Sequence, residues 1–333
     1  MSKILQVKNL TIGLKKKKER ISAVDHLSLS LERGKTLGII GESGSGKSLT
    51  CNSILGLLNK ATWDVKGEML LEEKAYHPEN RKEMQKICGN RIALIMQNPM
   101  SAFNPVITIR AHFEETLNKP GVKKKTRAEV AKIAEQLLER MYIRDPKSVL
   151  DSYAFQLSGG MLQRIMIALA LAVQPEILVA DEPTTALDLS VQYEILKILK
   201  ELQAEYNMSV LIVSHDLSVI RSLSDEIAVM YAGNFVEKGP AEEVLENPMH
   251  PYTRLLFAAK PDFTKNRLPV MQGQPPTLGN RAEGCRFRTR CPYEEESCAG
   301  YCEPVTFERE GHYCSCRKWE SINGGAADGN SNS

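Results

Sequence analysis

Aromatic residues, long apolar runs and an excess of either charge are all scarce in this sequence. Only 6% of its 333 residues are aromatic, and no uninterrupted apolar stretch reaches the length of about eighteen residues that a membrane-spanning helix needs. Residues 1–10 also lack the apolar core and cleavage site of a secretory signal. These absences predict a soluble, cytoplasmic chain, and its length predicts one large domain with a smaller one.

The charges are balanced. Forty-three Lys and Arg residues face 41 Asp and Glu residues, which leaves a formal net charge of +2. A field of one sign, which would attract nucleic acid or an anionic membrane, is therefore not expected.

Cysteine is rare along most of the chain and concentrated near its C-terminus. Cys51 and Cys88 are isolated, whereas the remaining cysteines are Cys285, Cys291, Cys298, Cys302, Cys314 and Cys316. In a reducing compartment, such a cluster is more often a metal site than a disulfide framework.

A glycine-rich stretch at 41–48 is the strongest motif. It reads Gly41, Glu42, Ser43, Gly44, Ser45, Gly46, Lys47, Ser48, and it follows an apolar run at 37–40. The pattern G-x-x-x-x-G-K-[ST] after a strand predicts a phosphate loop, whose glycines turn backbone N–H groups toward a polyphosphate. Lys47 is expected to reach the β- and γ-phosphates, and the Ser48 hydroxyl to bind magnesium. The sequence therefore predicts a nucleoside triphosphate site.

Hydrophobic periodicity places further elements around this loop. Alternation at 4–12 and 24–31 predicts antiparallel strands, and the apolar run 92–96 predicts a buried strand that ends at Gln97. Between 109 and 150, apolar residues recur at three- and four-residue spacings, which predicts a helical insert.

Two later apolar strands end in residues that carry chemistry. Residues 177–180 lead into Asp181 and Glu182, and residues 210–213 lead into Ser214 and His215. A short glycine-containing segment at 157–161 precedes both strands.

In this order, the motifs resemble those of the nucleotide-binding subunits of ABC transporters. The matching features are the phosphate loop, Gln97, the signature Leu157–Met161, Asp181, Glu182, Asp188 and His215. The resemblance covers about residues 1–245. It implies an α/β nucleotide-binding domain with a RecA-like parallel-sheet core, an antiparallel β subdomain and a helical subdomain at about 100–173.

Other features resemble the dipeptide, oligopeptide and nickel importers within that superfamily. They are Asn98-Pro99, Asn104-Pro105, Met161 at the last signature position, the stretch 247–253, Gly284-Cys285, Arg290-Cys291-Pro292-Tyr293 and Cys298. This resemblance implies a small cysteine-rich extension at 246–320. The Gly, Ala, Asn and Ser composition of residues 321–333 predicts a disordered tail.

The chemistry of ATP hydrolysis gives each polar residue a candidate role. Asp181 is expected to hold Mg²⁺ through water together with Ser48, and Glu182 to activate the attacking water. Gln97 is expected to sense the magnesium ion and that water. His215 is expected to hold the γ-phosphate and link it to Glu182.

The resemblance also implies partners. In the family, the signature residues, here Ser158, Gly159, Gly160 and Met161, act on ATP held by an opposing subunit, and Asp188 belongs to the loop that follows the catalytic carboxylates. We therefore expect a second, homologous ATPase subunit in a heterodimer. Two membrane permease subunits, an extracellular substrate-binding protein and a peripheral position on the cytoplasmic face of the cell membrane are also implied.

One position departs from the family pattern. Many relatives place an aromatic ring that stacks on adenine about thirty residues before the phosphate loop, where this chain has Leu14. Stacking of a base on an aromatic ring contributes roughly 1–3 kcal/mol, so modest adenine affinity is expected.

The cysteine-rich extension resembles a segment in which peptide importers bind an iron–sulfur cluster, with Cys285, Cys291, Cys298 and Cys316 at the ligand positions. Four thiolates suit either a 4Fe-4S cluster or Zn²⁺. Since the spacings lack the short C-x2-C of structural zinc sites, the cluster is favoured. Cys302 and Cys314 remain as spare thiols, alternative ligands or a disulfide. The segment has few aliphatic residues and is expected to need its metal to fold.

These observations predict the ATPase subunit of a peptide importer, with a nickel or metal-chelate importer as the alternative. A soluble ABC ATPase acting on DNA or ribosomes is a third reading. Those proteins carry two cassettes in one chain or a long coiled-coil insert, and this sequence has neither. Nucleic acid is therefore not expected as a partner.

Overall fold

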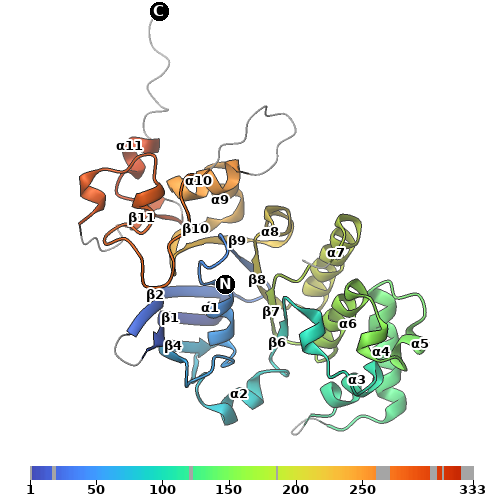
Figure 1. The fold of residues 1–333 in the computed structure, drawn as a ribbon. Coiled ribbons are helices and arrows are strands. Elements are labelled where there is room, and N and C mark those ends of the chain that lie inside the picture. Colours follow the sequence, from blue (N-terminus) through green and yellow to red (C-terminus); the bar gives the residue numbers. More distant parts are fainter. Residues whose placement is uncertain are drawn as a thin grey trace, which may run out of the picture.

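An antiparallel sheet forms the N-terminal part of the molecule. The computed structural model describes residues 2–16, 20–119, 123–184, 187–259, 271–300, 306–309 and 311–323. The sheet has the strand order β2-β1-β4-β5 (Figure 1). Its strands are β1 (Lys3–Lys15), β2 (Arg20–Glu32), β4 (Trp63–Leu71) and β5 (Lys74–Tyr76). The antiparallel pairing of β1 with β2 confirms the strands predicted from their alternating pattern.

A second, larger sheet forms the centre of the molecule, in the order β11-β12-β10-β9-β3-β8-β7-β6. Its strands are β3 (Thr36–Ile40), β6 (Ile92–Ile95), β7 (Ile177–Asp181), β8 (Ser209–Ser214), β9 (Glu226–Tyr231), β10 (Asn234–Pro240), β11 (Thr306–Arg309) and β12 (His312–Ser315). From β9 to β6, neighbouring strands run parallel. The segments that follow β3, β6, β7 and β8 therefore meet at one edge of the sheet, where ligands bind in open α/β sheets.

The parallel strands are apolar on both faces because each face is covered. Along β8, Val210 and Ile212 lie in one core with α6 (Gly159–Ala172), α7 (Leu189–Tyr206) and α8 (Leu217–Leu223). Leu211 and Val213 point the other way, into a core shared with the antiparallel sheet and α1 (Lys47–Ile54). Alternation of side chains along a strand thus fills two cores, and explains why these strands read as continuous apolar runs.

A helical lobe lies beside β6, as the sequence predicts (Figure 1). It contains η1 (Pro99–Ala102), α3 (Ile109–Leu117), α4 (Arg127–Arg140), α5 (Pro146–Leu150), η2 (Ala154–Gln156) and α6. A capping box between Thr126 and Glu129 begins α4, and Val130, Leu137 and Leu138 form its buried face. Local capping and a 3.6-residue period therefore suffice to specify this helix.

The remaining helices connect or flank the strands. They are α2 (Arg81–Ile87), α9 (Ala241–Glu246), α10 (Pro251–Ala258), η3 (Arg288–Arg290), η4 (Glu296–Cys298) and α11 (Trp319–Asn323). Within the described ranges, no helix combines the length and the apolar character needed to cross a membrane.

The C-terminal segment joins the main sheet. β12 pairs antiparallel with β10 through Glu237 and Cys314, and β11 pairs with β12. Phe287 is 1% exposed, and its ring centroid lies 5.2 Å from that of Tyr231 and 5.4 Å from that of Tyr252. An aromatic contact and a strand pair, neither of which the sequence predicts, thus hold this segment on the core.

Some predicted features fall at the edges of the described chain. α11 extends to Asn323, inside the stretch 321–333 predicted as a disordered tail, and residues 324–333 lie outside the described residues. Cys302 also lies outside them.

Candidate active site

The phosphate loop connects the central strand β3 to α1, in the strand–loop–helix setting that its motif requires. Gly44 and Gly46 have φ angles of 79° and 111°, a left-handed region that glycine adopts without strain. At Gly41, an added Cβ would lie 2.1 Å from the Met230 carbonyl oxygen. These glycines are therefore needed for the path of the loop itself.

Lys47 is buried at the end of the loop. Its Nζ donates to the Gly41 carbonyl oxygen at 2.7 Å and to the Glu42 carbonyl oxygen at 3.0 Å. Burial lowers the pKa of Lys47, and the charges of Glu182 and Asp181 oppose that shift. The side chain is thus a cation held within the loop and facing two carboxylates.

Two serines of the loop differ in environment. Ser43 is exposed, whereas Ser45 is buried and its Oγ has no hydrogen-bond partner among the residues that the structure describes. A buried hydroxyl without a partner is costly, and a phosphate oxygen would satisfy it.

Ser48 and Asp181 meet across the sheet edge, as predicted for magnesium ligands. Ser48 Oγ donates to Asp181 Oδ1 at 3.1 Å. Asp181 is 8% exposed, and burial raises the pKa of its carboxyl group, an effect that the nearby charge of Glu182 increases. A hydroxyl and a carboxylate oxygen are suitable Mg²⁺ ligands, and a bound cation would offset the burial of this carboxylate. Mg²⁺ commonly takes only one or two protein ligands beside phosphate oxygens and water.

Glu182 contacts polar side chains that follow the two strands on either side of β7. Gln97 Nε2 donates to its Oε2 at 2.8 Å, and His215 Nδ1 lies 3.0 Å from its Oε1. Gln97 follows β6, Glu182 follows β7, and His215 follows β8. The three residues that the sequence assigns to water activation and γ-phosphate binding are therefore in direct contact.

The backbone of Glu182 is unusual. Its φ angle is 49°, and its N–H donates to the Val213 carbonyl oxygen at 2.8 Å. Left-handed backbone at a residue other than glycine costs roughly 1–3 kcal/mol and is concentrated at functional sites. The buried Gln163 donates to the carbonyl oxygen of Pro183, the next residue, and so supports this turn.

The signature segment occupies a different place. Ser158 caps α6, with its Oγ accepting from the Met161 N–H at 3.3 Å, and both Ser158 and Gly159 are exposed. Gly160 and Met161 continue the first turn of this helix. Since α6 and α1 pack in the two separate cores on opposite faces of the main sheet, the signature does not complete the phosphate loop of its own chain.

Asp188 caps α7, where its Oδ1 accepts from the Val191 N–H at 3.0 Å. Beside it, Leu189 is 81% exposed and Tyr193 is 72% exposed. Since Leu189 and Tyr193 are four residues apart, they lie on one face of α7 as an exposed apolar pair.

Leu14 is the residue expected where many relatives have an aromatic side chain that stacks on adenine. It lies on β1 opposite Trp63 of β4. Directly opposed residues project on the same face of a strand pair. No local sequence signal identifies Trp63, because its proximity to Leu14 depends on the pairing of strands that are far apart in the chain.

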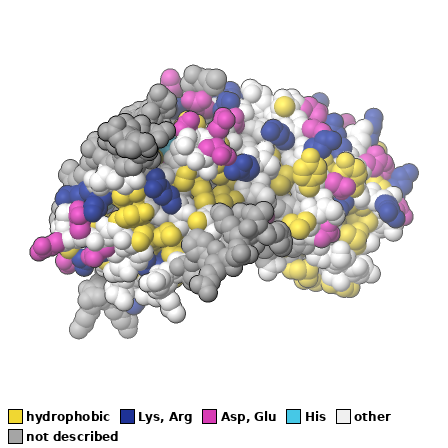
Figure 2. Space-filling view, turned by 90° about the horizontal axis from the view of Figure 1, so that it is seen from above, with side chains coloured by type: hydrophobic (Ala, Val, Ile, Leu, Met, Phe, Trp, Pro, Cys, Tyr) yellow, Lys and Arg dark blue, Asp and Glu magenta, His cyan; other side chains and the backbone are white. Residues whose placement is uncertain are grey.

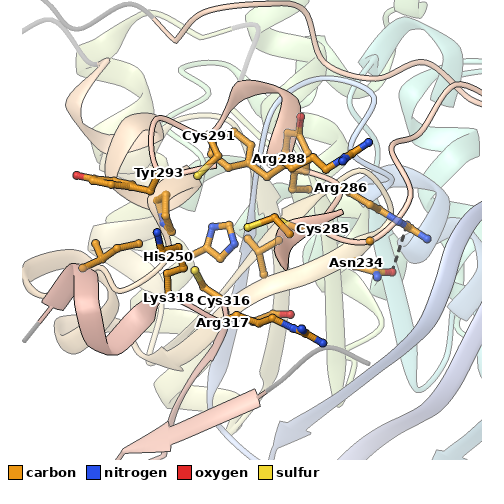
Figure 3. A pocket seen from close by; sticks show the side chains of 18 of the residues that line it. Asn234, His250, Cys285, Arg286, Arg288, Cys291, Tyr293, Cys316, Arg317 and Lys318 are labelled. Atoms are coloured by element: carbon orange, nitrogen blue, oxygen red, sulfur yellow. Dashed lines mark hydrogen bonds between the residues drawn. The ribbon is translucent and has the colours of Figure 1, made fainter. Parts of the chain in front are cut away.

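The four cysteines predicted as ligands converge. Cys285, Cys291, Cys298 and Cys316 line one cavity of about 110 Å³, and Figure 3 shows the sulfur atoms of the labelled cysteines directed into it. Burial raises the pKa of the Cys291 thiol to about 11. All cysteines in the described ranges are free thiols. No group of three or more His, Cys, Asp or Glu side chains in these ranges is arranged to hold a single metal ion.

Cys314 is separate from that cavity. It lies on β12 with 0% exposure, and burial raises the pKa of its thiol. Cys314 is buried as a free thiol, so of the alternatives left open by the sequence the structure does not show the disulfide in the part of the chain that it describes.

Two family models match this chain. Residues 24–185 match a family described as ABC transporter, and residues 236–298 match the C-terminal region of oligopeptide/dipeptide transporters. Similar proteins include the dipeptide transport ATP-binding protein DppD of Haemophilus influenzae, which is 39% identical over 95% of this chain and 94% of its own length. The oligopeptide transport ATP-binding protein AppD of Bacillus subtilis is 39% identical over 90% of this chain and 91% of its own.

Solved structures agree. The dimeric post-hydrolysis structure of the ATP-binding cassette MJ0796 with ADP and Pi superposes with a TM-score of 0.65 and 29% identity, covering 71% of this chain and 98% of that chain. The cbiO1 protein of Clostridium perfringens, part of the ABC transporter complex cbiONQ, superposes with a TM-score of 0.61 and 26% identity over 74% of this chain and 92% of that chain.

Proposed function

Because this chain belongs to the ABC transporter family, as an ATP-binding subunit with ATPase activity, we propose that it powers the import of peptides through a membrane permease. The observation that supports this most is the contact of Glu182 with Gln97 and His215, next to the Ser48–Asp181 pair. Glu182, the Ser48–Asp181 pair and the phosphate loop lie at one sheet edge, which supports ATP hydrolysis there.

In the proposed reaction, the phosphate loop and Lys47 bind the β- and γ-phosphates of ATP. Ser48 and Asp181 would hold Mg²⁺, which would supply neutralisation of the phosphate charge. Glu182 accepts a hydrogen bond from the attacking water and polarises it toward the γ-phosphorus. His215 binds a γ-phosphate oxygen and, through its contact with Oε1, keeps Glu182 oriented.

We propose that the hydrolytic site is shared between two subunits. The exposed Ser158 and Gly159 at the start of α6, and the exposed Leu189 and Tyr193 on α7, support a face that meets a second, homologous cassette. The helix start at Ser158 offers N–H groups and a positive dipole end to the partner's γ-phosphate. A heterodimer with a similar chain fits this proposal.

An apolar surface beside Gln97 supports a permease contact. Met100 is 52% exposed, Val106 is 76% exposed and Phe155 is 64% exposed. A β-bridge between Thr108 and Tyr153 brings these two segments together. Gln97 lies next to this surface in the sequence and contacts Glu182. A movement of the permease against this surface would therefore be transmitted through Gln97 to the Glu182 carboxylate. We place the chain peripherally on the cytoplasmic face of the membrane, with two permease subunits.

The face of the molecule in Figure 2 has no surface field of one sign among the described residues. Basic and acidic side chains are interspersed on the face shown, with hydrophobic groups between them (Figure 2). Mixed charge of this kind does not create the local positive field that nucleic-acid binding depends on.

Co-purification tests the transport assignment. Tagged full-length chain expressed with its neighbouring permease genes should bring down hydrophobic permease subunits and hydrolyse ATP in the assembled complex. Retention on nucleic acid at about 0.5 M salt, without permease, would instead support a soluble ABC ATPase, because non-specific binding weakens steeply with salt.

Peptide is the proposed cargo because the C-terminal region matches that of oligopeptide/dipeptide transporters and the similar proteins are named for peptides. An extracellular binding protein would select the cargo. Identification of the ligand in that binding protein decides between peptide and a nickel or metal chelate.

For the cysteine cavity, we propose a 4Fe-4S cluster held by Cys285, Cys291, Cys298 and Cys316. Four thiols around one cavity supply the donor set of such a cluster, and their sequence spacings lack the short C-x2-C of structural zinc sites. The cluster would stabilise the C-terminal segment and take no part in hydrolysis.

Anaerobically purified chain should then be brown and contain iron and acid-labile sulfide near four each per chain. Cys291→Ser should lose the colour, while Cys314→Ser, which changes a core thiol, should keep it. Stoichiometric zinc without iron in anaerobic protein would replace this proposal with a structural zinc site.

A further inference from the structure

Glu42, the second residue of the phosphate loop, is held by residues from the far end of the chain. Its N–H donates to the hydroxyl oxygen of Tyr252 at 2.9 Å, and its carbonyl oxygen accepts from Lys47. Its carboxylate points toward the C-terminal segment, where it meets Arg290. Glu42 therefore links the nucleotide loop to that segment by both backbone and side chain.

Arg290 makes a paired, buried contact with this carboxylate. Its Nη1 lies 2.6 Å from Glu42 Oε2 and its Nη2 lies 3.1 Å from Oε1. The Arg290 side chain is 3% exposed, and that of Glu42 is 26% exposed. Such a bidentate, largely desolvated pair is stronger and more directional than an exposed ion pair.

Further contacts fix the guanidinium in place. Arg290 Nε donates to the Gln272 carbonyl oxygen at 3.1 Å, and the guanidinium carbon lies 5.9 Å from the centre of the Tyr231 ring. Arg290 is the last residue of the short helix η3. Phe287, which precedes this helix, is buried in the core. Contacts with Gln272 and Tyr231 thus hold the Arg290 guanidinium beside the phosphate loop.

We propose that Arg290 is a positioning residue for nucleotide binding, acting through Glu42. A free carboxylate in the loop would repel the phosphates of ATP, and the paired guanidinium neutralises it. The same ion pair holds the first turn of the phosphate loop in place. The backbone N–H groups of this turn are therefore already ordered before the nucleotide binds, which lowers the entropic cost of binding. This inference rests on the proposed nucleotide site, and it does not depend on a metal cluster.

A second arginine connects the same segment to the nucleotide domain. Arg286 pairs with Asp25 of β2 and donates to the Ala232 carbonyl oxygen. Arg286 adjoins Cys285, and Arg290 adjoins Cys291. Each of these two arginines therefore lies next to a cysteine of the cavity in the sequence.

The test is the affinity of the purified full-length chain for a fluorescent ATP analogue. Arg290→Met should raise Kd about tenfold, as expected for losing a charged, paired hydrogen bond beside the phosphates. The double variant R290M/E42Q should recover most of that loss, because no unpaired carboxylate remains. In the assembled transporter, Arg290→Met should raise KM for ATP more than it lowers kcat.

Lys318→Met is the matched control, since Lys318 lies in the same segment and pairs with the exposed Glu295 away from the loop. It should leave Kd unchanged. If Arg290→Met does not fold, Arg290→Lys, which keeps the charge but not the bidentate geometry, takes its place and should weaken binding several-fold.

Two results would overturn the inference while the wild type binds ATP normally. One is a folded Arg290→Met, or Arg290→Lys in its place, whose Kd stays within twofold of the wild type. The other is a double variant as weak as Arg290→Met, because repulsion by Glu42 would then not be the cause. Failure of the wild type itself to bind ATP would instead refute the proposed nucleotide site.

Discussion

At the scale of single residues, both the side chain and the backbone conformation of Glu182 are determined by its neighbours in the site. One carboxylate oxygen accepts from Gln97 and the other faces His215, while the backbone occupies a left-handed conformation. Its side chain is 14% exposed, whereas that of His215 is 60% exposed. A carboxylate oriented by two neighbours and partly shielded from water is well placed to polarise a single attacking water molecule.

Glu182→Gln should lower ATP turnover in the assembled complex by about 10²–10⁴-fold, because an amide keeps the shape but is a poor proton acceptor. ATP affinity should stay within a few-fold of the wild type. Phosphate release and equilibrium nucleotide binding measure the two effects separately.

Glu176→Gln is the matched control, because Glu176 precedes the opposite end of β7 and pairs with Arg91. It should leave turnover unchanged. Near-normal turnover of Glu182→Gln would remove this carboxylate from the catalytic role.

At the scale of elements, the pairing of β1 with β4 shapes the region next to the base. Leu14 and Trp63 are opposed, and both are half-buried. The strand pair therefore carries an indole on the same face as the leucine that replaces the family's stacking ring.

Leu14→Tyr should tighten ATP binding by roughly 1–3 kcal/mol if the base lies against this position, because an aromatic ring then becomes available for stacking. Titration with ATP and with inorganic triphosphate separates the contribution of the base from that of the phosphates. An equal gain for both ligands, or no gain for ATP, would show that the base lies elsewhere.

Phe287 packs the C-terminal segment against the core. Phe287→Ala should destabilise the chain by about 3–5 kcal/mol, because the variant removes a fully buried ring that contacts both Tyr231 and Tyr252. Urea unfolding measures the loss, and limited proteolysis should show earlier cleavage in the C-terminal segment.

Tyr293→Ala serves as its control, since Tyr293 is an aromatic residue of the same segment but 44% exposed. Its effect should be well below that of Phe287→Ala. Equal effects of the two variants would show that Phe287 does not carry the packing of this segment.

At the scale of the whole molecule, the phosphate loop and the signature belong to separate layers. The phosphate loop lies beside the core that contains α1, and the signature lies beside the core that contains α6. If the hydrolytic site is shared, as we propose, one chain carries two half-sites, and a second cassette brings the complementary halves together.

Ser158→Arg should abolish hydrolysis at the site built on the partner's phosphate loop, because a bulky cation replaces the exposed hydroxyl at the start of α6. Nucleotide binding to this chain's own loop should be retained. Ser148→Arg, an exposed position on α5 in the same lobe, should preserve both. Full-rate hydrolysis by this chain alone, with no dimer detectable, would contradict the shared site.

The sequence by itself determined the elements and the chemistry that each one carries. The phosphate loop, the apolar strand before Asp181 and Glu182, and the amphipathic α4 were predictable because their signals are local: a turn that needs glycine, a strand buried on both faces, a helical period with caps. The parallel sheet then brings the strand ends together, so the contacts of Glu182 follow from the topology.

Only the tertiary structure decided how the C-terminal segment joins this site. Arg290 and Glu42 are separated by 248 positions, and β12 adds to β10 although no pattern in either strand specifies the other. Such contacts depend on the path of the chain in space. Charge and hydrophobicity along the sequence cannot identify which distant arginine meets which carboxylate, so the support of the phosphate loop became visible only in the folded chain.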